Sequence, residues 1–468
     1  MLFPTVQFAL FFVVVLTANW LLMRNRPWWK ITMLAASYVF YGAWDWRFVG
    51  LIVVSTLANQ AAAMAMGSTL DDRRRKRIIV AAVAGNLGLL GWFKYYGFFA
   101  SSLVNLFAGF GVELPLPLLQ ITLPVGISFF TFQALSYVLD VYWRTQEPAA
   151  PIDFAVFLAF FPQLVAGPIV RSSEFLPQLA TPRDPRRIPA AEAFLLVGGG
   201  LFKKVVVATT LGTEIVDPVF AQPEAYSALE VLMATYAYAI QIYADFSGYT
   251  DIAIGVALLL GFRFPQNFDN PYSAATLRDF WRRWHMTLSR WLRDYLYIPL
   301  GGSRRGEAAT YRNLMITMLL GGLWHGAAWT FVFWGALHGG WLAFERWLEQ
   351  RRAAAGAPDP NPWLGRFVTF HVVCLGWVFF RADSFETALA ILGRLADWGP
   401  APAVTPLVLA LVVGSIAVQY IPHGARLRLR EGFARLSPVG MTAALGLFLL
   451  VLDALGPEGV APFIYFQF

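Results

Sequence analysis

Apolar runs close to the length of a membrane span recur along the whole chain. Examples are Leu2 to Leu22, Val125 to Trp143 and Leu229 to Gly261, and about 20 apolar residues are enough for a helix to cross the hydrocarbon core of a bilayer. Only 14% of the 468 residues are charged, whereas soluble domains average about 25%. The sequence therefore predicts an all-α, polytopic integral membrane protein with about 11 transmembrane helices, together with re-entrant and interfacial helices.

The charged residues indicate the orientation of the chain and exclude one class of partner. Arg24, Arg26 and Lys30 directly follow the first span, which predicts that this end is cytoplasmic and that the N-terminus lies outside the cytoplasm. The dense cluster Asp71 to Arg77 is predicted to be a topology anchor at the membrane surface. The net charge of +7 comes from short loops, and no water-soluble basic surface is available for nucleic acid.

No polar block is large enough to form a separate soluble domain. We therefore predict a single membrane domain over residues 1–468, with N-terminal spans in 1–123, a core in 124–350 and peripheral spans in 351–468. One apolar segment, Phe154 to Val170, carries prolines and a glycine near its end. Irregular backbone at membrane depth must be buried in protein or hydrated in a cavity, so this segment is predicted to be a re-entrant hairpin.

Two pairs of charged residues lie within otherwise apolar runs of the predicted core. Lys203 and Lys204 separate two apolar halves, where long side chains can extend to the membrane interface. Asp245 and Asp251 lie in one long run, six residues apart, and therefore point to different sides of a helix. This spacing favours helix–helix hydrogen bonding over a paired acid/base site.

The stretch from Leu277 to Trp341 holds three of the five histidines: His285, His325 and His338. On a single continuous helix, His285 shares one face with Trp281, Trp284, Leu288, Trp291, Leu292 and Tyr295. The flank and far side carry the arginines Arg278, Arg282, Arg283, Arg290 and Arg293. An aromatic environment disfavours a charged imidazole, so His285 is either a neutral ring that exchanges a proton or a core residue bonded to a carbonyl.

His325 lies in a segment without charged side chains before Glu345, and Gly321, Gly322 and Gly326 surround it. Glycines there permit a close backbone approach or an unwound turn beside a ligand. His338 follows 13 residues later, about 20 Å away along a straight helix, which predicts packing rather than joint action with His325. No histidine or cysteine spacing is typical of a metal site. These patterns leave both acyl chemistry and a transporter with a histidine proton relay open.

Several motifs occur together in a fixed order. They are Pro124-Val125-Gly126-Ile127-Ser128-Phe129, Phe161-Pro162-Gln163-Leu164-Val165-Ala166-Gly167-Pro168, Asp245-Phe246-Ser247-Gly248-Tyr249, Pro265-Gln266-Asn267-Phe268, Phe280-Trp281-Arg282-Arg283-Trp284-His285, Arg293-Asp294-Tyr295-Leu296-Tyr297-Ile298-Pro299-Leu300-Gly301-Gly302, Leu323-Trp324-His325-Gly326 and the terminal Phe463 to Phe468. In this set the chain resembles the membrane-bound O-acyltransferase superfamily, and within it the bacterial alginate O-acetyltransferase branch.

The resemblance implies a ring of helices around a central tunnel in the bacterial inner membrane. By motif, His325 corresponds to the essential histidine of the family and His285 to its second active-site position. Arg282, Arg283, Arg290 and Arg293 would meet an anionic acyl donor, either acetyl-CoA or an acylated carrier protein, or else serve only as positive-inside anchors. No permanently bound cofactor is expected. A periplasmic acetyltransferase of the SGNH-hydrolase type and a polysaccharide acceptor are the implied partners.

The identity of the acceptor stays open at this point. Alginate is favoured, but the same motifs serve acetylation of cellulose, peptidoglycan or another exopolysaccharide, and also D-alanylation of teichoic acid. The absence of a detectable internal repeat counts against the transporter alternative.

Overall fold

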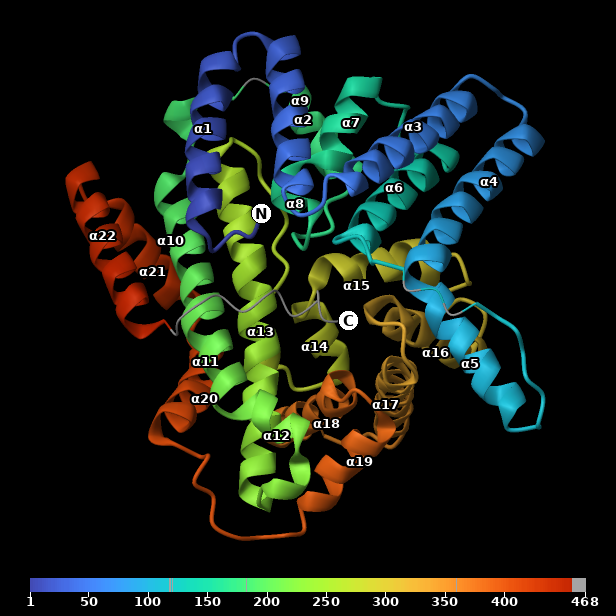
Figure 1. Cartoon of the computed structure of the whole chain (residues 1–468), viewed down its shortest axis with the longest axis vertical. Helices are drawn as coiled ribbons and strands as arrows, with labels where there is room; N and C mark the ends of the chain where they lie inside the picture. The colour runs from blue at the N-terminus through green and yellow to red at the C-terminus, as the bar shows by residue number, and fades with distance from the viewer. Residues whose placement is uncertain (118, 120, 182, 359, 457–468) are drawn as a thin grey trace. The chain divides into compact units, whose positions relative to one another are not determined.

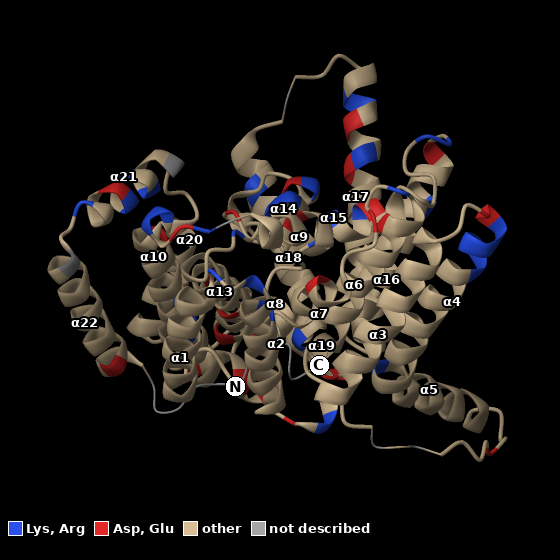
Figure 2. Ribbon diagram, turned by 90° about the horizontal axis from the view of Figure 1, so that it is seen from above, with Lys and Arg blue, Asp and Glu red and all other residues tan. Residues whose placement is uncertain are grey.

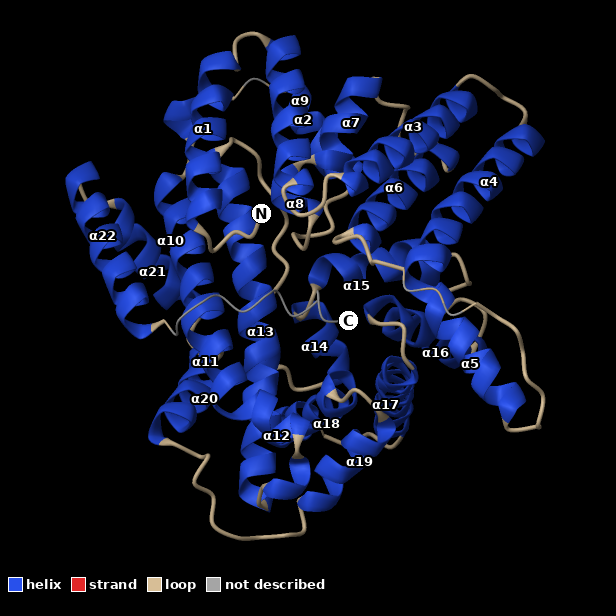
Figure 3. Cartoon of the chain, viewed as in Figure 1, coloured by secondary structure: helices blue, strands red, loops and turns tan. Residues whose placement is uncertain are grey.

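The computed structural model describes residues 1–456, except 118, 120, 182 and 359 (Figure 1). Among these residues all regular structure is helical and none is a β-strand (Figure 3), so the all-α prediction is confirmed. The terminal motif Phe463 to Phe468 lies outside the described residues.

The first of two compact units comprises residues 1–188 and 256–265. Most of its helices are apolar and follow one another closely, apart from the longer connection 109–126. The helices are α1 (Val6–Leu22), α2 (Arg26–Gly42), α3 (Arg47–Gly67), α4 (Asp72–Leu90), η1 (Gly91–Tyr95), α5 (Tyr96–Ala108), α6 (Ile127–Tyr142), α7 (Pro151–Ala159), α8 (Phe161–Leu164), α9 (Ser172–Ala180) and η2 (Pro185–Arg187).

The second unit comprises residues 189–255 and 266–468 and contains all three histidines of the central stretch. Its helices include most of the long α13 (Ala228–Leu259). The others are α10 (Ala190–Leu201), η3 (Phe202–Ala208), α11 (Thr209–Leu211), η4 (Gly212–Val216), α12 (Asp217–Ala221), η5 (Pro223–Ala225), η6 (Pro271–Ser273), α14 (Leu277–Arg283), α15 (Met286–Leu292), η7 (Arg293–Tyr297), α16 (Glu307–His325), α17 (Trp329–Ala354), α18 (Pro362–Arg381), α19 (Phe385–Arg394), α20 (Pro406–Val418), α21 (His423–Ala434) and α22 (Pro438–Leu455).

Within the described part of the chain, five helices are long and apolar enough to cross a membrane: Arg47–Gly67, Asp72–Ala108, Ala190–Ala221, Ala228–Leu259 and Pro362–Arg381. A sixth is added if Gly424–Ala434 and Val439–Leu455, bent by 117°, form one span. Many charged residues lie near helix ends, as at the start of α4 and the end of α17 (Figure 2). This distribution keeps the middle of most helices apolar, as membrane-spanning segments require.

The segment predicted to be irregular is broken in the structure. The backbone turns at Phe160, between α7 and α8, and residues 156–170 are all buried. Burial in protein is what makes such a break tolerable in an apolar environment. The break is therefore confirmed, and the re-entrant path of the segment stays a prediction.

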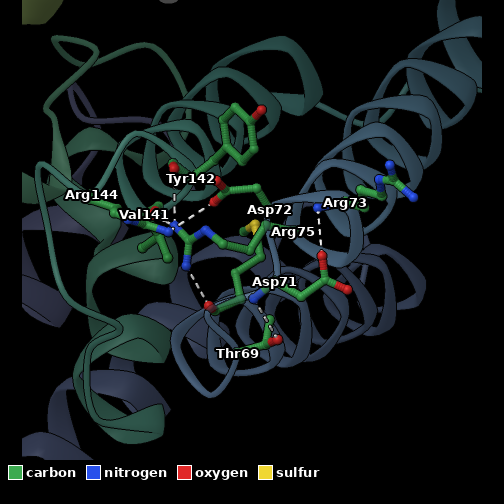
Figure 4. A network of polar contacts seen from close by, with 9 residues as sticks. Thr69, Asp71, Asp72, Arg73, Arg75, Val141, Tyr142 and Arg144 are labelled. Atoms are coloured by element: carbon green, nitrogen blue, oxygen red, sulfur yellow. Dashed lines mark hydrogen bonds and ion pairs between the residues drawn. The ribbon is translucent and has the colours of Figure 1, made fainter.

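One arginine of the basic cluster Asp71 to Arg77 has a role that the sequence did not predict. Arg75 on α4 is 5% exposed, and its guanidinium donates hydrogen bonds to the carbonyls of Met66, Val141 and Tyr142 (Figure 4). These carbonyls belong to the last turns of α3 and α6. Because helix C-termini carry unpaired carbonyls and partial negative charge, Arg75 joins three helices of the first unit.

The Arg75→Met variant is therefore expected to lose on the order of 2–3 kcal/mol of stability, since three buried carbonyls lose a charged donor. The measurement is the thermal unfolding of the detergent-purified protein. Arg74→Met is the matched control, because Arg74 belongs to the same cluster but is exposed. Equal destabilisation by the two variants would show that the loss of charge, and not the hydrogen bonds of Arg75, is responsible.

Candidate active site

The helix predicted to carry His285 is interrupted at this residue. α14 ends at Arg283, α15 begins at Met286, and His285 has a φ of 41° in the left-handed region. The prediction of one continuous helix is therefore wrong. A residue other than glycine pays roughly 1–3 kcal/mol for such a conformation, so contacts from elsewhere in the fold must hold it.

Asn267 supplies these contacts. Its side-chain oxygen accepts hydrogen bonds from the backbone N–H and the hydroxyl of Thr287, at 3.1 and 2.9 Å. Its backbone carbonyl accepts one from the N–H of Met286 at 2.9 Å. These bonds replace the helical ones lost at the break. The sequence placed Asn267 in a family motif but did not predict that it holds the break at His285. The one available signal was an amide side chain in that motif.

Asn267 also sets the tautomer of His285. The side-chain oxygen of Asn267 lies 3.2 Å from Nδ1 of His285, and because this oxygen can only accept, Nδ1 donates. The lone pair of the ring is then on Nε2. His285 is fully buried, with the ring of Phe246 edge-on at 4.7 Å. Burial lowers the pKa of His285, because desolvation disfavours the charged form. The neutral ring can accept a hydrogen bond or a proton at Nε2.

The predicted division between an aromatic and a charged face persists across the break. Trp284, Leu288 and Trp291 are buried, whereas Arg282 and Arg293 are exposed. Tertiary packing of the apolar side chains therefore preserves the pattern even where the helix does not continue.

His325 is the last residue of α16 and is 3% exposed. The rings of Trp334 on α17 and Phe380 on α18 meet it edge-on, with centroids 5.1 and 5.3 Å away. The carbonyl end of a helix stabilises a nearby positive charge, typically by about 0.3–1 kcal/mol. This position therefore favours the imidazolium that would form if His325 accepted a proton.

The glycines around His325 allow α16 and α17 to approach closely, as predicted. A Cβ on Gly322 would lie 2.2 Å from the carbonyl oxygen of Phe331, and one on Gly335 would lie 2.3 Å from that of Met318. Side chains at either position would force the two backbones apart. The glycines thus have a packing role, which also determines where the end of α16 lies.

The structure brings His285 and His325 together. Their ring centroids are 6.5 Å apart at an interplanar angle of 64°, and Trp324 contacts both rings. Trp334 contacts both His325 and His338, with ring centroids 5.1 and 4.6 Å away, so His338 is closer to His325 than a straight helix would allow. The reason is that the chain turns back between the end of α16 and the start of α17 at Trp329. The straight-helix assumption was therefore wrong.

The four candidate donor-binding arginines do not form one uniform group. Arg283 pairs with Asp279 at 2.9 Å and Arg293 with Asp294 at 2.6 Å. Arg282 is exposed and, among the described residues, has no ion pair, while Arg290 is partly exposed. The charges of Arg283 and Arg293 are partly neutralised by their neighbours, so Arg282 keeps the most available charge for an anion.

The lysines predicted to extend to the membrane interface instead pair with the two aspartates of α13. Lys204 is 3% exposed and pairs with Asp245, which is equally buried. Lys203 pairs with Asp251 at 2.5 Å and is less buried. The prediction for Lys204 was wrong, because a charge partner lies within the fold. Helix–helix bonding by both aspartates is confirmed.

Two neighbouring imidazoles, one at a helix end and one in a strained backbone turn, are suited to proton transfer. Both are excluded from water, which strengthens electrostatic interactions with a reacting group. Within the described residues, no three side chains of His, Cys, Asp or Glu lie close enough to hold a metal ion.

The family model described as "MBOAT, membrane-bound O-acyltransferase family" matches residues 146–380, which include both histidines. Among similar proteins, "Probable alginate O-acetylase AlgI" of Pseudomonas putida is 37% identical over all of both chains. The protein of the same name from Pseudomonas aeruginosa is 41% identical over 85% of this chain and 75% of its own length. The "Peptidoglycan O-acetyltransferase" of Helicobacter pylori is 38% identical over 79% of this chain and 74% of its own length. The chain thus belongs to the membrane-bound O-acyltransferase family and is a multi-pass integral membrane acyltransferase.

Proposed function

We propose that this acyltransferase takes an acetyl group from a cytoplasmic thioester donor and passes it across the membrane for O-acetylation of an extracellular polysaccharide, with alginate as the acceptor. The observation that carries the proposal is the pair of buried imidazoles, His285 and His325, at a centroid distance of 6.5 Å. The names of the relatives from Pseudomonas support alginate as the acceptor.

The proposed topology rests on the apolar runs of the chain and on the positions of its basic residues. The chain would cross the bacterial inner membrane about 11 times, with its N-terminus outside the cytoplasm and its helices in a ring around a tunnel. The cytoplasmic assignment of the basic helices α14 and α15 rests on their exposed arginines, such as Arg282. The donor would enter on that side and the acetyl group would leave on the other.

In the proposed reaction, His325 takes the proton of an acceptor hydroxyl, and the hydroxyl oxygen attacks the thioester carbonyl carbon. A C–O bond forms, the C–S bond breaks, and the leaving thiolate receives the proton from the imidazolium. The position of His325 at the carbonyl end of α16 supports this role, because it stabilises the imidazolium formed on the way. No covalent acyl-enzyme is needed.

His285 is assigned a positioning role on the donor side. Polarising the thioester carbonyl would require a hydrogen-bond donor, whereas Nε2 of the neutral ring accepts when Nδ1 donates to Asn267. His285 therefore orients a donor N–H or the acceptor hydroxyl. Arg282 and Arg290, with Arg283 and Arg293 beside them, would meet the anionic part of acetyl-CoA or of a carrier protein.

The partners complete the proposed transfer. A periplasmic acetyltransferase of the SGNH-hydrolase type would receive the acetyl group and pass it to the polysaccharide. Peptidoglycan is the second candidate acceptor, because the Helicobacter pylori relative is as similar as several alginate-named ones. D-alanylation of teichoic acid is a weaker candidate, since the relative so named from Streptococcus thermophilus is 31% identical over 55% of this chain.

Deletion of the gene in its own host tests the proposal. The expected result is a secreted uronate polymer that lacks alkali-labile acetyl groups, with restoration by the wild-type gene. The peptidoglycan acetyl content and the ester-linked D-alanine of the envelope are measured in the same cells. Loss from peptidoglycan alone would reassign the acceptor, and unchanged acyl content in all three fractions would overturn the proposal.

A further inference from the structure

We propose that Trp281 and His338 are positioning residues, which hold Trp334 against His325 and fix α14 beside it; this inference rests on the proposed function. The indole N–H of Trp281 donates a hydrogen bond to Nδ1 of His338 at 3.2 Å. Trp281 is on α14, four residues before His285, and His338 is on α17. The bond therefore joins the helix that precedes His285 to α17, which packs against the helix that ends at His325.

The direction of this bond defines the state of His338. An indole nitrogen can only donate, so Nδ1 of His338 accepts and its proton is on Nε2. His338 is fully buried, and its Nε2 faces Gly376 on α18, where a Cβ would lie only 2.7 Å away. Any larger residue at position 376 would displace the imidazole, so the fold provides space for this ring in this orientation.

Trp334 transmits the position of His338 to the candidate base. Its ring packs on His338 with centroids 4.6 Å apart and an interplanar angle of 34°, and it meets His325 edge-on at 5.1 Å. Trp281 contacts the same indole at 5.7 Å. Trp334 is thus enclosed on two sides by a hydrogen-bonded pair and on a third by His325.

The packed rings of Trp281, His338 and Trp334 form a layer beside His325. This layer explains why a histidine, and not a phenylalanine, is useful at position 338. An aromatic side chain without an acceptor could still pack on Trp334, but it would leave the indole N–H of Trp281 without this partner. A shift of about 1 Å in a reacting group can lower a rate on the order of a hundredfold. The Trp281–His338 bond therefore acts on catalysis through the placement of His325.

A double-mutant cycle tests the inference in whole cells of the deletion strain. The variants are Trp281→Phe, His338→Phe and the double variant, and the readout is the ester-linked acyl group that the deletion removes, per amount of folded protein. Each single variant is expected to lose on the order of tenfold in acyl transfer, as for one hydrogen bond. The double variant is expected to lose no more, because both changes remove the same bond.

His338→Asn separates positioning from a general packing effect, because its side-chain oxygen can replace Nδ1 as the acceptor. We expect this variant to recover most of the activity lost in His338→Phe. His371→Phe is the matched control, since His371 also bonds an aromatic side chain, Tyr236 at 2.8 Å, but lies outside the layer. It is expected to keep wild-type transfer.

Two results would overturn the inference: single variants with unchanged transfer per folded protein, or a double variant whose loss is the product of the two single losses. A failure of the proposed function itself is recognised independently. It would appear as normal acyl transfer by a variant in which His325 is replaced. That comparison uses only this variant and the wild type, and it does not depend on Trp281 or His338.

Discussion

The His325→Ala variant is expected to abolish acyl transfer while the protein still inserts and folds. A positioned general base contributes on the order of a hundredfold to ten-thousandfold to a rate, and His285, whose ring centroid lies 6.5 Å from that of His325, is assigned a different role. The measurement is the ester-linked acetyl content of the secreted polymer in the complemented deletion strain, with the membrane content of the protein determined in parallel.

Burial makes a folding control necessary for this variant. Alanine at position 325 leaves a cavity between Trp334 and Phe380, and cavities of this kind destabilise a core. His325→Gln fills more of the space and has no imidazole, so it is expected to be equally inactive but better folded. His371→Ala removes a histidine of α18 outside the site and should keep normal acetylation. Normal acetyl content in either His325 variant would contradict the base assignment.

Much of the fold could be predicted because its signals are local. The apolar runs predict helices such as α6 and α13 to within two residues at each end, since a membrane-spanning helix satisfies its own backbone hydrogen bonds. The two candidate histidines were likewise singled out by their unusual apolar surroundings and their motifs, and their catalytic role stays a prediction. Neither inference required knowledge of which segments touch.

The features that could not be predicted depend on contacts between distant segments. The break at His285 needs the side chain of Asn267, 18 residues earlier in the chain, and the helical periodicity continues through it. The proximity of His338 to His325 needs the turn after α16, where one apolar run becomes two antiparallel helices. Lys204 looked like an interfacial residue until its partner on α13 was placed beside it.

The second large effect is expected at this buried ion pair. Lys204→Met and Asp245→Leu should each destabilise the protein by about 3–5 kcal/mol, because either change leaves one charge buried without its ionic partner. The combined variant should be closer to the wild type, since it removes both charges and keeps a similar volume. Thermal unfolding and folded yield of the detergent-purified protein measure these differences.

The neighbouring pair provides a matched control. Lys203 and Asp251 make the same kind of contact between η3 and α13, but their side chains are 24% and 28% exposed, against 4% for both Lys204 and Asp245. Water can solvate a charge left by Lys203→Met, so this variant should be destabilised less. Equal losses at positions 203 and 204, or a double variant as unstable as the worse single one, would contradict the account.

The Lys204–Asp245 pair also has a consequence for the active site. Gly200 on α10, which runs directly into η3, and Gly248 on α13 let these helices approach closely. A Cβ on either glycine would lie under 3 Å from the carbonyl oxygen of the other. Asp245 is therefore held firmly on α13, and the next residue, Phe246, contacts His285 edge-on at 4.7 Å. If the ion pair matters only for folding, the combined variant should transfer acyl groups normally per folded molecule. A lower rate in that variant, at wild-type stability, would show that the position of α13 also sets the position of His285.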